Sequence, residues 1–267
     1  MSEYKIGFIG SGKMATAIAA GLVNQKVFQP SEIIASDVSD DSLNYFKEKC
    51  GAEICKDNKT IINEASTVVV AVKPQMAELV CSSLTVKPET HIISIAAGLK
   101  IATLEKWLKT KKITRVMPNT PLMVGMGASA YCCGEGVNQN EKELVEQIFG
   151  CAGVIKAVHE KDIDAVTGVS GSGPAYVFEF IESLAIAGEK NGLNYATSLS
   201  LAVQTVAGAA EMVSKKMGTP DELRNAVTSP NGTTYAALQD LKAKNFRDII
   251  SSAVDAAVVR SIELGKE

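Results

Sequence analysis

The segment that decides the fold is Lys5-Ile6-Gly7-Phe8-Ile9-Gly10-Ser11-Gly12-Lys13-Met14-Ala15. Its apolar first half predicts a buried strand, and its end opens a stretch with apolar residues at helical spacing. A G-x-G-x-x-A loop between a strand and a helix is typical of dinucleotide-binding domains, because Gly10 permits the tight turn and Gly12 lets the backbone approach a pyrophosphate. We expect cofactor contacts from Gly10, Ser11, Gly12, Lys13 and Met14. The alternative is a glycine turn in an α/β domain that binds no nucleotide.

Strand and helix patterns alternate through the rest of the N-terminal part. Expected strands cover residues 32–36, 52–55, 67–72, 91–96 and 113–117, and expected helices cover 14–24, 41–49 and 101–109. Such alternation implies βαβ units and a parallel sheet. Strand patterns end near Asp162, and alanine-rich helical patterns follow. We therefore expect an α/β fold with two domains, a Rossmann-type parallel-sheet domain at residues 1–161 and an all-helical domain at residues 162–267.

The composition excludes several classes of protein. Net charge is −3 with no basic block, which argues against binding to nucleic acid or to an anionic membrane surface. No apolar run is long enough to cross a bilayer, and the N-terminus leads directly into a strand, so we expect no signal peptide and a cytoplasmic protein. The six cysteines form no C-x-x-C pair and only two histidines accompany them, so we expect no metal site.

Ligands of open α/β sheets bind beyond the carboxyl ends of the strands. The ends to consider here are residues 71–74, 96–98 and 117–121. In the last of these, two prolines flank Asn119 and Thr120 and fix a rigid turn. We expect Asn119 to contact the nicotinamide, although the same motif also suits a plain turn.

Asp37 follows the second expected strand, where an acidic residue would bond the ribose hydroxyls of NAD and repel the 2′-phosphate of NADP. The neighbouring Ser36 could instead bond a phosphate, and Lys13 could lie close. Asp37 also suits a turn or a helix cap before Asp40 and Asp41. The sequence leaves the choice between NADH and NADPH open.

Near the C-terminus, residues 228–234 read Thr-Ser-Pro-Asn-Gly-Thr-Thr and precede a helical pattern at residues 235–241. A helix start that offers free N–H groups beside several hydroxyl groups can hold a carboxylate without an arginine. Taken alone, the run also suits an ordinary helix cap.

Together these segments resemble pyrroline-5-carboxylate reductase, along residues 6–15, 71–74, 117–121, 164–176 and 221–234. The resemblance implies an enzyme of proline biosynthesis with NADPH or NADH as cofactor. It also implies a helical domain that binds substrate and forms a homodimer, with a decamer as a further possibility. One departure is visible: Asn225 lies one place before the position, here Ala226, at which some members carry Asn.

The resemblance further implies individual roles. Thr234 would bond the ring nitrogen of the substrate, and the backbone at Gly232 and Thr233, with Ser229, would hold its carboxylate. Glu160 matches a position near the substrate, but it suits a solvated surface acid equally well. Cofactor-contact positions are matched by Ser36, Asn58, Ala71, Val72, Lys73, Pro74 and Ala96.

We expect hydride transfer from NAD(P)H to the imine carbon of 1-pyrroline-5-carboxylate, giving L-proline. A threonine hydroxyl is a poor acid, so Thr234 would mainly position the ring nitrogen. Two other functions stay open. One is a β-hydroxyacid dehydrogenase-like enzyme, for which Lys190 would be the acid–base candidate although no motif surrounds it. The other is a non-catalytic protein that senses NAD(P) or binds another ligand.

Overall fold

The structure is a computed structural model that describes residues 3–265. These residues form two compact units. Unit 1 runs to Ser172 and includes the C-terminal stretch from Ala256, and unit 2 is Gly173–Asp255. The expected domain boundary between residues 161 and 162 stays a prediction, because a compact unit is defined by packing and a domain also by independent folding.

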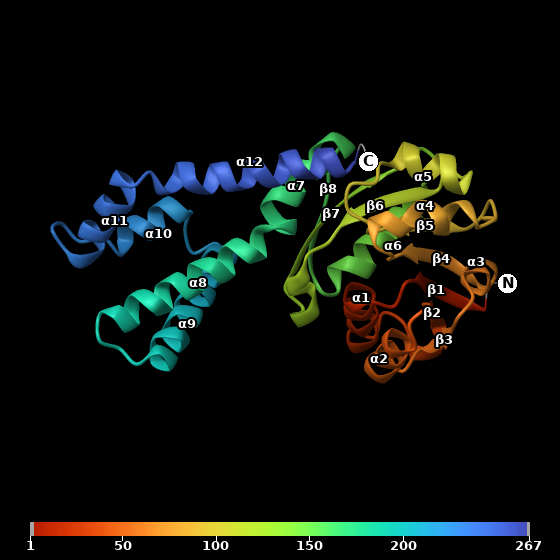
Figure 1. Cartoon of the computed structure of the whole chain (residues 1–267), viewed down its shortest axis with the longest axis horizontal. Helices are drawn as coiled ribbons and strands as arrows, with labels where there is room; N and C mark the ends of the chain where they lie inside the picture. Colours follow the sequence, from red (N-terminus) through yellow and green to blue (C-terminus); the bar gives the residue numbers. More distant parts are fainter. Residues whose placement is uncertain (1–2, 266–267) are drawn as a thin grey trace. The chain divides into compact units, whose positions relative to one another are not determined.

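Unit 1 is built on an eight-stranded sheet with the order β3-β2-β1-β4-β5-β6-β7-β8 (Figure 1). The strands are β1 (Tyr4–Ile9), β2 (Ile33–Ser36), β3 (Glu53–Cys55), β4 (Ala65–Val70), β5 (His91–Ser94), β6 (Ile113–Met117), β7 (Gly127–Cys133) and β8 (Gly153–Ala157). From β3 across to β6 the neighbouring strands are parallel, which confirms the α/β class expected from the sequence. The expected strand at 67–72 ends earlier, at Val70, because helix α4 (Pro74–Ser82) begins shortly afterwards.

Two strands were not predicted. β7 is antiparallel to β6, with Thr114 opposite Cys133, and β8 is parallel to β7. The segment that links β6 to β7, residues 118–126, is shorter than the crossover of roughly a dozen residues that a parallel pair needs, so an antiparallel pair results. Small residues dominate β7, and its strand pattern is correspondingly weak.

Helices cover both faces of this sheet. Alternate residues of β1 point to opposite faces, so Phe8 packs in one apolar cluster and Ile9 in the other. The Phe8 face is covered by α1 (Lys13–Asn24), α2 (Asp40–Cys50) and α6 (Gln139–Gly150), and the Ile9 face by α3 (Asn58–Glu64), α4 and α5 (Ile101–Leu108). Burial on both faces explains the continuous apolar runs of the central strands.

After β8, the 3-10 turn η3 (Glu160–Asp162), the short helix α7 (Ile163–Val166) and the π-helical turn η4 (Thr167–Gly171) complete the first part of unit 1. Unit 2 contains α8 (Gly173–Lys190), α9 (Tyr195–Ser214), α10 (Pro220–Ala226) and α11 (Thr233–Ala243). Helix α12 (Phe246–Leu264) begins in unit 2 and ends in unit 1. α8 and α9 lie side by side (Figure 1).

Unit 2 has little apolar core of its own. Within the described residues of this unit, only Ala185, Ser198 and Ala202 are buried, whereas large apolar side chains such as Phe178 and Leu201 are 63% and 55% exposed. On α9, the apolar side chains of Val203 and Val213 are also exposed. Exposed apolar faces of this extent are typical of a protein interface.

Candidate active site

The glycine loop leaves the start of α1 open. Gly10 has φ +96°, and a Cβ atom there would lie 2.8 Å from the carbonyl oxygen of Ala71, so only glycine fits. At Gly12 a Cβ atom would meet nothing within 4 Å. None of the described side chains caps α1, and Thr16 is the first residue whose N–H group bonds back to Gly12. The N–H groups of residues 12–15, at the start of this helix, can therefore face an anion.

The carboxylate of Asp37 fastens this loop to the end of β2. Its Oδ2 atom accepts hydrogen bonds from the N–H and hydroxyl groups of Ser11, at 2.8 and 3.2 Å, and its Oδ1 atom accepts from the N–H group of Ser39 at 2.9 Å. Both carboxylate oxygens thus have partners within the protein. This geometry favours a turn-stabilising role for Asp37 over a direct bond to the ribose.

Ser36 is fully buried, and its hydroxyl group donates to the Oδ1 atom of Asn58 at 2.7 Å. A direct bond from this hydroxyl group to a cofactor phosphate would require the side chain to leave that partner. Asn58, the first residue of α3, is half-buried and is the more accessible of the two. Their cofactor contacts stay predictions.

The structure brings the other predicted cofactor residues to one edge of the sheet. Because β1, β4, β5 and β6 are parallel neighbours, the residues that follow them share the carboxyl edge: Gly10, Ala71, Val72, Lys73, Pro74, Ala96 and Asn119. Lys73 precedes α4 and Pro74 is its first residue, a place where proline suits a helix. The N–H group of Ala71 donates to Ile9 at 2.8 Å, which joins this edge to the glycine loop.

Asn119 is nearly buried and makes two hydrogen bonds through its side chain. Its Oδ1 atom accepts from the N–H group of Ala128 at 2.8 Å, and its Nδ2 atom donates to the carbonyl oxygen of Ser170 at 3.0 Å. The amide therefore ties the end of β6 to the start of β7 and to the π-helical turn. Turns of this kind are frequent at functional sites.

Glu160 is held by two partners in unit 1. Its Oε1 atom accepts from the N–H group of Ile101, at the start of α5, at 2.7 Å, and from the Nη1 atom of Arg115 at 3.4 Å. The Arg115 side chain is only 4% exposed. Since Arg115 lies within an apolar strand, the sequence did signal a buried cation, but its partner is visible only in the folded chain. These bonds favour a structural role for Glu160, and its expected contact with substrate stays a prediction.

The run at residues 228–234 forms a second open helix start, in unit 2. Gly232 precedes α11, and no described side chain caps this helix. A Cβ atom at Gly232 would overlap Ser229 Oγ, so the backbone approaches that hydroxyl group closely. Thr233 and Thr234 are the first two residues of α11, and Thr234 is half-buried. N–H groups at such a start suit a carboxylate.

Asn225 lies one place before the position at which some family members carry Asn. Its side-chain amide donates to the carboxylate of Asp221 at 3.0 Å.

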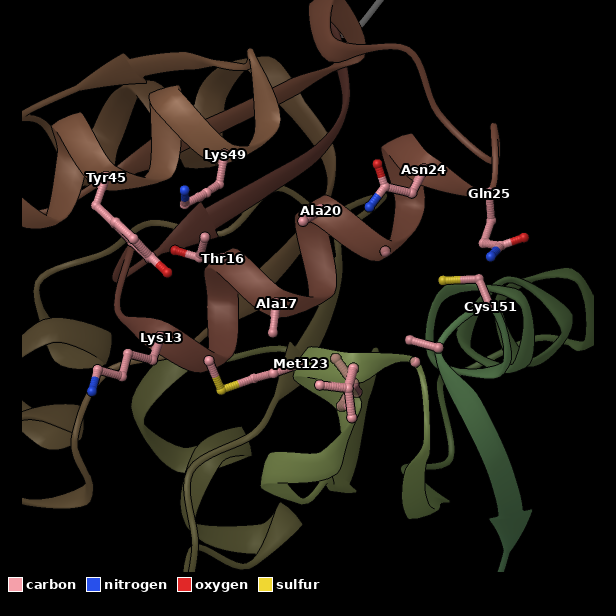
Figure 2. A pocket seen from close by; sticks show the side chains of 15 residues that line it. Lys13, Thr16, Ala17, Ala20, Asn24, Gln25, Tyr45, Lys49, Met123 and Cys151 are labelled. Carbon is pink, nitrogen blue, oxygen red and sulfur yellow. The ribbon is translucent and has the colours of Figure 1, made fainter. Parts of the chain in front are cut away.

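Two cavities lie near these residues, one in each unit. In unit 1 a cavity of about 410 Å³ follows the outer side of α1 and includes only Lys13 among the predicted cofactor residues. Figure 2 shows Thr16, Ala17 and Ala20 along α1, Tyr45 and Lys49 on one side, and Met123 on another. Because its wall is not the carboxyl edge of the sheet, it is not the expected cofactor cleft. In unit 2 a cavity of about 790 Å³ is lined by α10, α11 and the start of α12, including Thr228.

The buried cysteines are unsuited to nucleophilic chemistry. Burial raises the pKa of Cys50 and Cys132 to about 12 and that of Cys81 to about 11, so these thiols are poor nucleophiles. Among residues 3–265, no group of three or more His, Cys, Asp or Glu side chains could hold a metal ion.

An open glycine loop at the carboxyl edge of a parallel sheet, followed by a helical region, defines a two-part dinucleotide-binding protein. Residues 5–98 match the family model for NADP oxidoreductase, coenzyme F420-dependent, and residues 160–264 match that for pyrroline-5-carboxylate reductase dimerisation. The chain belongs to the pyrroline-5-carboxylate reductase family and is an oxidoreductase of proline biosynthesis.

Similar proteins match the chain over nearly its whole length. It is 42% identical to a pyrroline-5-carboxylate reductase of Glycine max, over 98% of this chain and 96% of that protein. A solved pyrroline-5-carboxylate reductase from Coxiella burnetii has a TM-score of 0.92 and 39% identity over 100% of both chains. The pyrroline carboxylate reductase of Plasmodium falciparum, solved with NADP bound, has a TM-score of 0.87 and 36% identity over 99% of both chains.

Proposed function

We propose that this chain reduces the C=N bond of 1-pyrroline-5-carboxylate to L-proline, with NADPH or NADH as the electron donor. The observation that carries the proposal is the pair of open helix starts, α1 after Gly12 and α11 after Gly232. Each suits an anion: the pyrophosphate of the cofactor in the first case and the carboxylate of the substrate in the second.

NADPH or NADH, when bound, would supply the hydride for the imine carbon; the π electrons of the C=N bond would pass to nitrogen, which would take a proton. The N–H groups at Gly232 and Thr233, with Ser229, would hold the carboxylate. Thr234 would hold the ring nitrogen by its hydroxyl group. A threonine hydroxyl is a poor acid by itself, so Thr234 would contribute mainly orientation and could pass on a proton from water.

The cofactor would lie along the carboxyl edge of the sheet. The N–H groups of residues 12–15 would face the pyrophosphate, and Ala96 and Asn119 would flank the nicotinamide. Because Asp37 already has three hydrogen-bond donors as partners, we expect it to act by shaping the glycine loop.

The test is an absorbance assay of purified protein with 1-pyrroline-5-carboxylate and, in turn, NADH and NADPH. Rapid oxidation of either cofactor together with formation of L-proline is the expected result. If both cofactors bind and neither is oxidised, the hydride-transfer assignment fails.

We also propose that residues 160–264 form a homodimer. The exposed apolar side chains of α8, α9 and α12 support this, because burying them against a second copy would supply the core that unit 2 lacks. Assembly of such dimers into a decamer is the further step. Sedimentation measured over a range of protein concentrations distinguishes monomer, dimer and decamer.

The location we propose is the cytoplasm. No helix of residues 3–265 is long and apolar enough to span a membrane. All six cysteines are free, which suits a reducing compartment. Cell fractionation with an antibody against the chain tests this.

A further inference from the structure

The C-terminal end of α12 packs directly on the loop between β5 and α5, residues 95–100. Gly98 in this loop has φ +79°, and a Cβ atom on it would lie 3.2 Å from the carbonyl carbon of Leu264. A Cβ atom on Gly265 would lie 2.7 Å from the carbonyl oxygen of Gly98. Two backbones far apart in the sequence thus touch at glycines, where any side chain would separate them.

A partly buried hydrogen bond anchors the same end of α12. The hydroxyl group of Ser261 donates to the Oδ1 atom of Asp164 on α7 at 2.7 Å, and Ser261 is only 5% exposed. The N–H group of Gly265 donates to the carbonyl oxygen of Ser261 at 3.2 Å, which closes the last turn. Ser261 therefore fixes where Leu264 and Gly265 meet the loop.

The loop is also fixed at its other end. Its last residues lead into α5, whose first N–H group, at Ile101, donates to the carboxylate of Glu160. Glu160 and Asp164 belong to the same short segment after β8. One segment thus fixes the loop twice, directly through Glu160 and indirectly through Asp164 and the end of α12.

Ala96 lies at the start of this loop, at the carboxyl edge of the sheet, and is 4% exposed. A shift of the loop at Gly98 would be passed to Ala96, because only one residue separates them. We propose that the turn Ser261–Gly265 is a positioning element that holds the β5–α5 loop in the conformation that binds the nicotinamide end of the cofactor. This inference rests on the proposed function, since it assumes that Ala96 flanks the nicotinamide.

The proposal predicts a separation of kinetic constants. Ser261→Ala removes the anchor, and Gly265→Ala pushes on the carbonyl group of Gly98. Both variants should raise the Kd and KM of NADPH or NADH about fivefold, the factor expected for one hydrogen bond, while the KM of the imine substrate stays unchanged. Asp164→Asn keeps an acceptor for Ser261 and should stay close to wild type, whereas Asp164→Ala should resemble Ser261→Ala.

The Kd can be measured without turnover. The single tryptophan, Trp107, lies near the end of α5, the helix that follows the loop, and its fluorescence can be titrated with each cofactor. Matched controls are Ser82→Ala, at an exposed serine that ends α4, and Gly150→Ala, where a Cβ atom would meet only Ile155 at 3.8 Å. Neither control should alter cofactor binding.

An unchanged cofactor Kd in both Ser261→Ala and Gly265→Ala would overturn the inference, even if the variants unfold at lower urea concentration, because a purely structural role would lower stability alone. An equal rise in the KM of both substrates would overturn it as well. Failure of the proposed function looks different: wild-type protein would then not oxidise NAD(P)H with the imine at all, or would show no cofactor binding by fluorescence.

Discussion

The side-chain amide of Asn119 donates to the carbonyl oxygen of Ser170, 51 positions further along the chain, at 3.0 Å. The same amide accepts from the N–H group of Ala128. The end of β6, the start of β7 and the π-helical turn before α8 are therefore joined by one residue at the edge where the cofactor is expected. Asn119 is therefore needed for the fold, whether or not it also contacts the cofactor.

Asn119→Ala should destabilise the protein. It leaves the N–H group of Ala128 and the carbonyl group of Ser170 without their partner, at a cost of about 1–3 kcal/mol for each group that stays buried. Urea unfolding at fixed protein concentration should show a lower midpoint with an unchanged slope. Asn63→Ala, at an exposed residue of α3, is the control. A midpoint equal to that of wild type would contradict the joining role.

Asp37→Asn separates the two roles considered for that carboxylate. Because Asp37 accepts bonds from Ser11 and Ser39, we expect the affinities for NADH and NADPH to fall together, by about three- to tenfold. A direct ribose contact would instead predict a loss for NADH and a relative gain for NADPH. The ratio of the two dissociation constants decides between them, with Asp40→Asn, an exposed neighbour paired with Lys56, as the control.

Thr234→Ala should lower kcat about 10- to 100-fold with nearly unchanged NAD(P)H binding, because the variant loses the group that orients the ring nitrogen. Thr234→Ser keeps the hydroxyl group and should recover most of the activity. Thr233→Ala is a matched control, since only the backbone of Thr233 is expected to bind substrate. Weaker cofactor binding in Thr234→Ala would remove the basis for its assigned role.

Gly232→Ala should raise the KM of the imine and leave that of the cofactor unchanged. The new methyl group would overlap Ser229 Oγ, so the hydroxyl group and the helix start could not both keep their places. Ser229→Ala should give a smaller rise, about fivefold, because it removes one hydrogen bond without moving the backbone. The order of the two effects is the measurement. A larger effect from Ser229→Ala would show that steric placement is not the main factor.

His91 makes folding stability depend on pH. It is 1% exposed, its Nε2 atom is bonded to Thr114 Oγ1, and its Nδ1 atom has no partner among the described residues. Burial lowers the pKa of His91 to about 4. The nearby charges have smaller effects: Glu141 raises this pKa and Lys112 lowers it. Below its ordinary pKa of 6.5, His91 binds a proton in the unfolded chain but not in the folded chain. The free energy of unfolding therefore falls as the pH drops from about 6.5 to about 4.

The expected loss from His91 between pH 7 and pH 5 is roughly 2 kcal/mol. Urea unfolding at the two pH values measures it, at one protein concentration because a dimer's stability depends on concentration. In His91→Val this part of the pH dependence should vanish, whatever the absolute stability of the variant. The same slope in wild type and variant would contradict the assignment.

Much of the fold could be predicted from local patterns. The glycine loop between a strand and a helix and the β-branched run before Lys73 were enough for the parallel sheet and its carboxyl edge. Strand β7 was not predicted, because its small residues give a weak strand pattern. Its antiparallel direction follows from the short segment between β6 and β7. That direction is a property of chain length and closure, which periodicity does not report.

The candidate site divides in the same way. The open helix starts after Gly12 and Gly232 could be predicted from the sequence, because glycine, or a run of capping residues, marks an unusual helix start. Their ligand contacts stay predictions. Side chains that act through partners could not be assigned. The sequence left Asp37 open between a ribose contact and a turn, and Glu160 open between a substrate contact and a surface acid. The folded chain supplies each with backbone N–H partners.

The sequence by itself determined the class of fold, the position of the glycine loop and the resemblance to one reductase family, because these depend on neighbours within a few turns of chain. Only the tertiary structure decided that Asn119 reaches Ser170, that Arg115 and Glu160 meet, and that Gly98 receives the end of α12. Hydrogen bonds and close backbone contacts between distant segments require particular distances, and those arise only when the packed sheet and helices bring the segments together.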